Sequence, residues 1–170
     1  LTSKVNIKAK VGAVALASVL SFLAIQEGDG PVRATPAGPV HVAYVDDVGV
    51  KTICHGHTAG VKLGDTATPA MCKQWMLEDL QTADAAVERL VTVDLTDYQR
   101  VALWSFIYNV GSGNFASSTM LRLLNRGEFC AAAKQFLRWN KGDGRVLRGL
   151  TKRRAAESDL FLRGYTCNSP

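Results

Sequence analysis

The stretch YVDDVGVKTICHGHT, Tyr44–Thr58, decides the fold of this chain. Its fifteen residues include two adjacent carboxylates, two histidines and a cysteine. From Val48 to Cys54, β-branched residues alternate with others over most of the run, a pattern typical of a strand or hairpin. We expect Asp46 to lie near one tip of this hairpin and Gly56 at the next turn.

Helical periodicity dominates the chain after this hairpin. Thr68 is suited to cap a helix that has Pro69 in its first position and continues to Leu90. Further helices are expected over Leu95–Val110, from Ser117 or Ser118 to Gly127, over Glu128–Trp139 and over Gly149–Arg163, with a turn at Gly142–Gly144. Residues 26–43 are rich in Gly and Pro and predict a loop. Strands that precede a run of helices predict an α+β fold.

The first 25 residues have the layout of an export signal. Lys4, Lys8 and Lys10 precede an uncharged run of fifteen residues, Val11–Ile25, of which seven are Gly, Ala or Ser. The run is short for a membrane span, which needs about 20 apolar residues. We favour an uncleaved, marginal membrane anchor over residues 1–25 with a body over 26–170. A cleaved signal peptide and a core helix of a cytosolic protein remain alternatives.

Length and charge leave the partner open. A chain of 170 residues suits one domain with an appendage. Its net charge of +5 and pI of about 9.2 favour a polyanion, which includes nucleic acid, anionic lipid and bacterial cell wall. Basic residues are concentrated in Arg138–Arg154, which is equally well explained as a solvated helical face.

The hairpin resembles that of the phage-type lysozymes, which are the endolysins of glycoside hydrolase family 24. Five residues separate Asp46 from Thr52, as in the family's Asp-to-Thr spacing. Glu27, in the turn Gln26–Gly30, occupies the place of the family's acid. Eighteen residues separate Glu27 from Asp46, ten more than in the family, and Pro31–Val40 accounts for the difference as a loop insertion.

Two downstream blocks extend the resemblance over Glu27–Arg163. The matching residues are Gln99, Arg100, Ala102, Leu103, Ser105, Phe106, Asn109 and Gly111 in the first block, and Phe136, Trp139, Gly149, Leu150, Arg153, Arg154 and Glu157 in the second. The resemblance implies a lysozyme-like α+β fold with a small β-hairpin lobe and a helical lobe around a cleft. We expect an N-terminal apolar helix to precede them here.

The resemblance also assigns catalytic roles. Glu27 would be the general acid, with a pKa raised by partial burial at a lobe junction. Asp46 would stay ionised and orient the attacking water together with Thr52, with inversion at the sugar carbon. Asp47 competes with Asp46, but strand alternation puts Asp46 and Thr52 on one face. Without the motif, these acids would be explained as ordinary turn residues.

Five polar residues on the helices would bind substrate by the same resemblance: Gln99, Ser105, Asn109, Arg153 and Arg154. One of the two arginines would pair with Glu27 across the cleft. Buried hydrogen bonds between helices explain Ser105 and Asn109 equally well. A surface pair of Arg154 with Glu157, spaced i,i+3, is the alternative for the last helix.

The four cysteines suit two disulfides outside the cytoplasm or buried thiols inside it, and the sequence allows three pairings. We predict Cys54–Cys72 and Cys130–Cys167. A zinc site from Cys54, His55, His57 and Cys72 is a further possibility. On a strand, however, the two histidines share a face that Cys54 does not, so no metal and no cofactor are expected. A nucleophilic Cys54–His pair is disfavoured because the resembled family has no nucleophile at that position.

These inferences favour an endolysin muramidase. It would hydrolyse the β-1,4 bond between N-acetylmuramic acid and N-acetylglucosamine in bacterial peptidoglycan for host lysis. We expect a monomer that binds no nucleic acid, is held inactive at the periplasmic face of the host inner membrane by residues 11–25, and works in the periplasm after release. The alternative is a membrane-tethered module without catalysis that binds wall or nucleic acid, which the interleaved Phe136, Arg138 and Trp139 favour.

Overall fold

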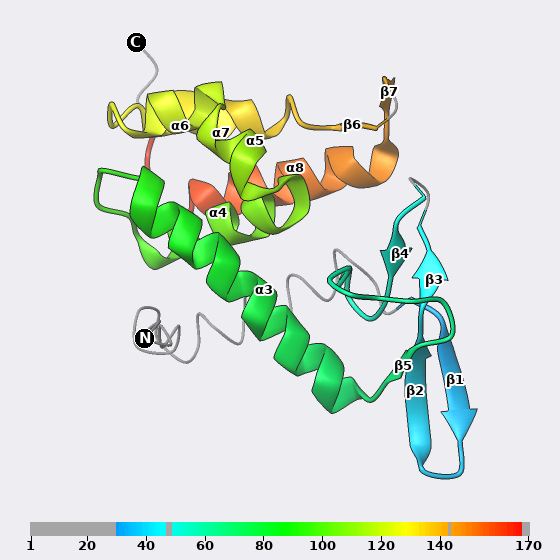
Figure 1. Ribbon diagram of the computed structural model, residues 1–170. Coiled ribbons are helices and arrows are strands. Elements are labelled where there is room, and N and C mark those ends of the chain that lie inside the picture. The colour runs from blue at the N-terminus through cyan, green and yellow to red at the C-terminus, as the bar shows by residue number, and fades with distance from the viewer. Residues whose placement is uncertain (1–29, 47–48, 143, 168–170) are drawn as a thin grey trace. The chain divides into compact units, whose positions relative to one another are not determined.

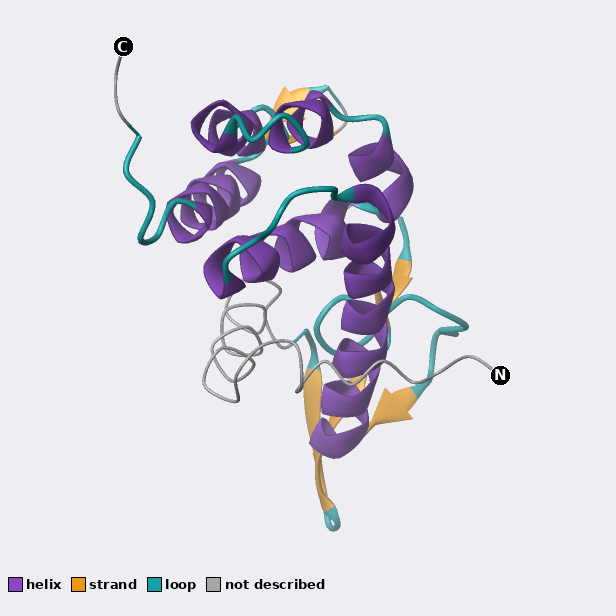
Figure 2. Cartoon of the chain, turned by 90° about the vertical axis from the view of Figure 1, so that its left-hand side faces the viewer, coloured by secondary structure: helices purple, strands orange, loops and turns teal. Residues whose placement is uncertain are grey.

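The computed structural model describes residues 30–46, 49–142 and 144–167. They fall into two compact units, one within Ala17–Leu80 and one within Gln81–Pro170. Strands form the first part of the chain and helices most of the rest, as Figures 1 and 2 show. The α+β prediction is therefore confirmed. The expected N-terminal apolar helix and the anchor at 1–25 lie outside the described residues. Within the described part, no helix has the length and apolarity needed to cross a bilayer.

The elements follow one another in the order that Figure 1 labels. The strands are β1 (Val32–Thr35), β2 (Gly38–Val42), β3 (Tyr44–Val45), β4 (Lys51–Thr52), β5 (Thr66–Ala67), β6 (Lys141–Gly142) and β7 (Arg145–Val146). The helices are α3 (Pro69–Leu90), α4 (Asp97–Val110), α5 (Ser112–Ala116), α6 (Thr119–Leu124), α7 (Phe129–Phe136) and α8 (Arg148–Phe161). The first half of α3 belongs to the unit with the early strands and its second half to the helical unit.

The predicted loop at Pro31–Val40 is wrong, because this segment forms the hairpin β1–β2. The chain turns at residues 36–37, where Pro36 suits the first central position of a β-turn. Pro39 lies within β2 opposite Ala34, but β5 pairs only with His41 and Val42 and does not extend as far as Pro39. The missing N–H of Pro39 therefore leaves no gap in that ladder.

The predicted hairpin in Tyr44–Thr58 is confirmed. Strands β3 and β4 pair antiparallel, with Tyr44 opposite Thr52 and Val45 opposite Lys51. The core of this unit is a small apolar cluster, against which Val61 and Trp75 pack. Its buried members are Ala43, Ile53, Cys54, Ala67 and Cys72. The short strands are thus fixed by burial and by covalent links more than by the length of their ladders.

The helical unit is built around α4. Thr96 caps this helix as predicted, in a capping box with Gln99, and Gly111 ends it. Helix α4 packs against α8, and α7 packs against both α6 and α8. Fully buried aromatic side chains fill the space between them, namely Trp104, Phe106, Phe115, Phe136 and Phe161.

The helix ends in this unit differ from the prediction by up to three residues. No helix is predicted over residues 112–116, but Ser112–Ala116 forms the short helix α5, in which Phe115 is completely buried. Helix α7 ends at Phe136 instead of Trp139. The turn predicted at Gly142–Gly144 is present and joins the two strands of the ladder β6–β7. At Phe115, burial overrides local propensity.

Candidate active site

The hairpin β3–β4 brings Asp46 and Thr52 to the same face. Tyr44 lies directly opposite Thr52, and Asp46 follows Tyr44 by two residues, so alternation puts all three side chains on one side of the ladder. The backbone N–H of Asp46 donates to the carbonyl of Val50 at 2.9 Å, which extends the pairing past the last formal strand residue. Asp46 and Thr52 are therefore diagonal neighbours, with Cα atoms roughly 7–8 Å apart by the geometry of such pairs.

Each of these two side chains also stabilises the hairpin. The Asp46 carboxylate accepts a hydrogen bond from the Val50 N–H at 2.8 Å, which closes the turn. The Thr52 hydroxyl donates to the Val50 carbonyl at 3.1 Å, and the Thr52 side chain is only 3% exposed. Asp46 is half-buried. The expected turn role of this carboxylate is real, and it leaves the charge at a fixed place on the hairpin.

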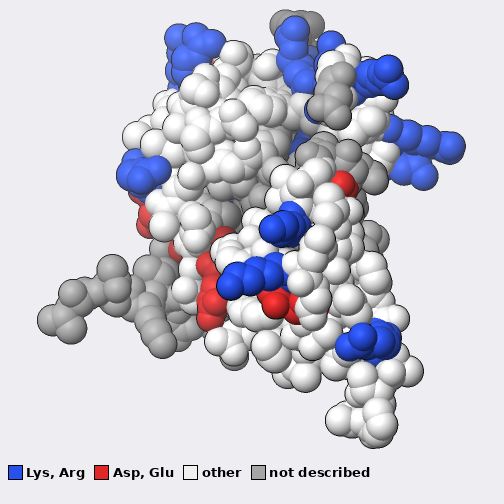
Figure 3. Space-filling view, turned by 45° about the vertical axis from the view of Figure 1, so that its right-hand side comes forward, with Lys and Arg blue, Asp and Glu red and all other residues white. Residues whose placement is uncertain are grey.

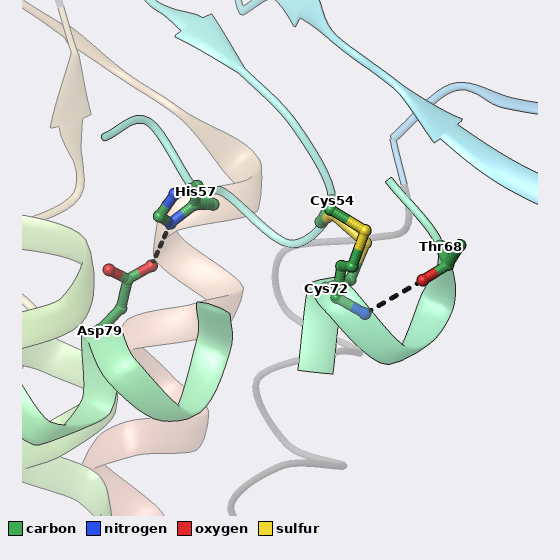
Figure 4. The surroundings of a disulfide bond; sticks show 6 residues. Cys54, His57, Thr68, Cys72 and Asp79 are labelled. Carbon is green, nitrogen blue, oxygen red and sulfur yellow. Dashed lines mark hydrogen bonds and ion pairs between the residues drawn. A yellow bond between two sulfur atoms is a disulfide. The ribbon is translucent and has the colours of Figure 1, made fainter. Parts of the chain in front are cut away.

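Beyond Thr52, two links tie the chain to α3. The Ile53 and His57 backbones pair around a tight turn in which Cys54 and Gly56 have φ values of 57° and 87°. Cys54 forms the predicted disulfide with Cys72 in the first turns of α3 (Figure 4). The strand that carries Thr52 is thus held covalently within two residues of its hydroxyl.

The second link is a histidine–carboxylate pair. His57 Nδ1 lies 2.8 Å from Asp79 Oδ2 (Figure 4). The His57 ring also stacks on Trp75, with centroids 4.8 Å apart. Sequence reasoning missed both partners. The signal was available, because Cys72, Trp75 and Asp79 are spaced i, i+3 and i+7 and so share one face of α3.

In the helical unit, a buried ionic cluster forms around Glu157, which is completely inaccessible to solvent. Its Oε1 accepts hydrogen bonds from Ser105 Oγ at 2.6 Å and from Arg153 Nε at 3.0 Å. Its Oε2 accepts from Arg154 Nη1 at 2.5 Å, and Arg154 also bonds to Asn109 Oδ1. The predicted Arg154–Glu157 pair is present, but its expected place on a surface helix is wrong, because both side chains are buried.

The five residues expected to bind substrate therefore have internal partners. Gln99 is buried, and its Oε1 accepts from the Thr96 backbone N–H at 2.9 Å in the capping box. Ser105, Asn109, Arg153 and Arg154 all belong to the cluster around Glu157. Hydrogen bonding between helices, the alternative interpretation for Ser105 and Asn109, is confirmed, and a direct contact of any of the five with substrate stays a prediction. Glu27 and Asp47 lie outside the described residues.

The interleaved residues Phe136, Arg138 and Trp139, which favoured a surface for nucleic-acid bases, do not form an exposed stacking surface. Phe136 is completely buried, and Trp139 packs edge-on against Phe106 with centroids 5.5 Å apart. In the segment Arg138–Arg154, five basic residues are exposed, but Arg153 and Arg154 are not. Figure 3 shows Lys and Arg side chains in several separate groups on the face in view. Phe136 therefore offers no platform for nucleic-acid bases, and Trp139 is half-buried.

Comparison with known proteins decides the family. The family model for phage lysozyme matches residues 37–157. A SAR-endolysin of Bacteriophage PS119 is 41% identical over 155 residues, which span 90% of this chain and 89% of the relative. The chain belongs to the phage lysozyme family. It is accordingly a lysozyme-type glycoside hydrolase of the endolysin kind, as the resemblance implied.

Solved structures agree with this assignment. A structure of a P22 lysozyme mutant is 36% identical, has a TM-score of 0.70, and covers 86% of this chain and 96% of its own. The muramidase domain of SpmX from Asticaccaulis excentricus is 30% identical, also has a TM-score of 0.70, and covers 85% and 95% respectively. The fold of this phage lysozyme family member is therefore lysozyme-like.

The second predicted disulfide, Cys130–Cys167, is confirmed in its helical unit.

Proposed function

We propose that this chain is an endolysin in which Glu27, Asp46 and Thr52 hydrolyse the β-1,4 bond between N-acetylmuramic acid and N-acetylglucosamine with inversion. Glu27 gives its proton to the leaving oxygen as the bond to the anomeric carbon breaks. A water molecule attacks that carbon from the opposite face and passes a proton to Asp46. Thr52 holds this water in line through its hydroxyl.

The diagonal placement of Asp46 and Thr52 on one face of the hairpin is the observation that carries this proposal. Side chains at this separation leave room for one water between a carboxylate acceptor and a hydroxyl. The hairpin is also rigidly supported, since the Cys54–Cys72 disulfide and the His57–Asp79 pair anchor its far end. Such support is what a positioned nucleophilic water requires.

We further propose that residues 1–25 hold the protein in the host inner membrane before lysis, with the body facing the periplasm. The names of several relatives support this, for they are SAR-endolysins at about 40% identity over 90% of this chain. Glu27 follows the apolar run Val11–Ile25 after a single residue. An anchored chain would keep Glu27 at the lipid surface and remain inactive, and the released form would act as a monomer on peptidoglycan in the periplasm.

Hydrolysis of purified cell walls by the full chain tests the catalytic residues. Glu27→Gln should abolish the release of new reducing ends, because general acid–base steps contribute roughly 10²–10⁴-fold each. Asp46→Asn is the sharper test of the second acid, since its amide oxygen still accepts the turn hydrogen bond from Val50 while the charge is lost. Thr52→Val should be inactive and Thr52→Ser should retain activity.

Asp47→Asn is the matched control, because it removes the neighbouring charge and should leave most of the activity. Circular dichroism and thermal midpoints must show that every variant folds like the parent. Full hydrolysis by Glu27→Gln would refute the assignment of the acid. Equal losses in Asp46→Asn and Asp47→Asn would refute the separate role of Asp46.

A further inference from the structure

A buried cluster of metal-binding atoms lies in the strand-bearing unit. It joins His41 of β2, Cys54 of the turn after β4, and Cys72 of α3. One ligand atom of each residue lies within 4.8 Å of the others, and the three residues are 7%, 2% and 1% exposed. Among the described residues, these are the three His, Cys, Asp or Glu side chains that lie close enough together to hold one ion.

In the oxidised protein this cluster holds no thiolate, because Cys54 and Cys72 are joined in a disulfide. Thiolates are the form in which cysteine binds a metal. The ligand chemistry of the cluster therefore depends on its redox state. A chain that has not yet formed the disulfide, or that a dithiol has reduced, presents two sulfur ligands and one imidazole at the same place.

We propose that the reduced chain binds one Zn²⁺ through His41, Cys54 and Cys72, with His55 as the fourth ligand. Zn–S distances of about 2.3 Å and Zn–N distances of about 2.0 Å place the ligand atoms of a tetrahedral site roughly 3.5–3.8 Å apart. The three groups already lie within 4.8 Å, so side-chain rotation closes the site without a large movement of the backbone. The His55 ring lies 5.9 Å from that of His41, centroid to centroid.

His57 is not part of the buried cluster, although the sequence CHGH would include it. Its Nδ1 is bonded to Asp79, and its ring is stacked on Trp75. His41 comes from a strand thirteen residues before Cys54 and is not part of the local sequence motif. The site is therefore tertiary, and the proposal departs from the expectation that the chain binds no metal.

A zinc ion here would join the two parts of the chain that the disulfide joins, and β2 in addition. It would connect β2, the turn after β4 and the start of α3, and so hold the hairpin before oxidation. Folding and metal binding would then be coupled. On oxidation by a disulfide-bearing oxidant, the two thiolates lose two electrons and form the S–S bond, and Zn²⁺ leaves. The oxidant is reduced to two thiolates, which take up protons from water.

Cobalt binding to the full chain in detergent micelles tests the proposal, with a phosphine reductant that does not compete for metal. The reduced chain should bind one Co²⁺. The complex should show the intense visible bands of tetrahedral Co²⁺ together with thiolate-to-metal charge-transfer bands. Addition of Zn²⁺ should remove both sets of bands. The oxidised chain should bind none. His41→Asn should weaken binding by more than about 100-fold, since the loss of even an outer partner of a ligand costs about 10–100-fold.

Two variants serve as matched controls. His57→Asn should bind Co²⁺ like the parent, and so should Cys130→Ser combined with Cys167→Ser, which removes the other thiol pair. Zn²⁺ should also raise the thermal midpoint of the reduced parent but not that of His41→Asn. The proposal is wrong if the reduced parent shows no one-to-one tetrahedral complex, if His41→Asn binds equally well, or if the complex persists in Cys54→Ser combined with Cys72→Ser.

Discussion

Removal of the charge of Glu157 should strongly destabilise the helical unit. Both oxygens of this carboxylate accept hydrogen bonds from buried groups, two of which are the guanidinium groups of Arg153 and Arg154. Glu157→Gln keeps the size of the side chain but turns one acceptor oxygen into an NH₂ group. That NH₂ group would face an arginine N–H donor, so one charge-assisted hydrogen bond is replaced by a donor–donor contact.

The magnitude follows from burial. The side chains of Arg153, Arg154 and Glu157 are 4%, 1% and 0% exposed, so solvent cannot replace the lost anion. Breaking a buried pair by removal of one partner costs about 3–5 kcal/mol. Gln retains one acceptor, which favours the lower end, about 3 kcal/mol. For a chain of this size, that corresponds to a fall in the thermal midpoint of roughly 6–12 °C.

Urea unfolding of the oxidised protein measures this loss, followed by tryptophan fluorescence and circular dichroism at one pH. Asp159→Asn is the matched control, because it removes one negative charge from an exposed position on the same helix, and should change the stability by less than about 0.5 kcal/mol. Ser105→Ala should cost about 1.5–3 kcal/mol, since it removes one hydrogen bond to the buried charge. The reasoning would be refuted if Glu157→Gln left the unfolding slope unchanged and changed the free energy of unfolding by less than about 1 kcal/mol. A change that small is on the order of the effect of an exposed charge.

Two further predictions concern the disulfides and the N-terminal segment. Loss of the Cys54–Cys72 link, with a sequence separation of 18, should destabilise by about 3 kcal/mol, and loss of Cys130–Cys167, with a separation of 37, by about 4 kcal/mol. Serine pairs at each site, compared by urea unfolding, measure this, and a larger loss for the shorter loop would contradict the chain-entropy argument. Replacement of Gly12, Ala13 and Ala15 by Leu should keep the protein in the membrane fraction and delay lysis, because added apolar area contributes roughly 25 cal/mol per Å². A soluble Leu-rich variant, or one that lyses as early as the parent, would favour a cleaved signal peptide.

The sequence by itself determined the features that depend on neighbouring residues. The hairpin at Tyr44–Thr58 followed from alternation, and the caps at Thr68 and Thr96 followed from side chains that bond to backbone three residues away. The pairing Cys54–Cys72 agreed with the prediction because the hairpin and the first helix turns are close in the chain. Asp46 and Thr52 shared a face because the strand period is two.

Only the tertiary structure decided which distant groups meet. The segment Pro31–Val40 forms the hairpin β1–β2, and β2 continues to His41 and Val42, where it pairs with β5, a partner that no local pattern announces. Arg153 and Arg154 are buried, because α4 presents Ser105 and Asn109 to the last helix. His41 lies beside the Cys54–Cys72 disulfide because the fold brings β2, the turn after β4 and α3 together. Local propensities are worth tenths of a kcal/mol per residue, and burial of a charge or an aromatic ring is worth several, so long-range packing prevails wherever the two conflict.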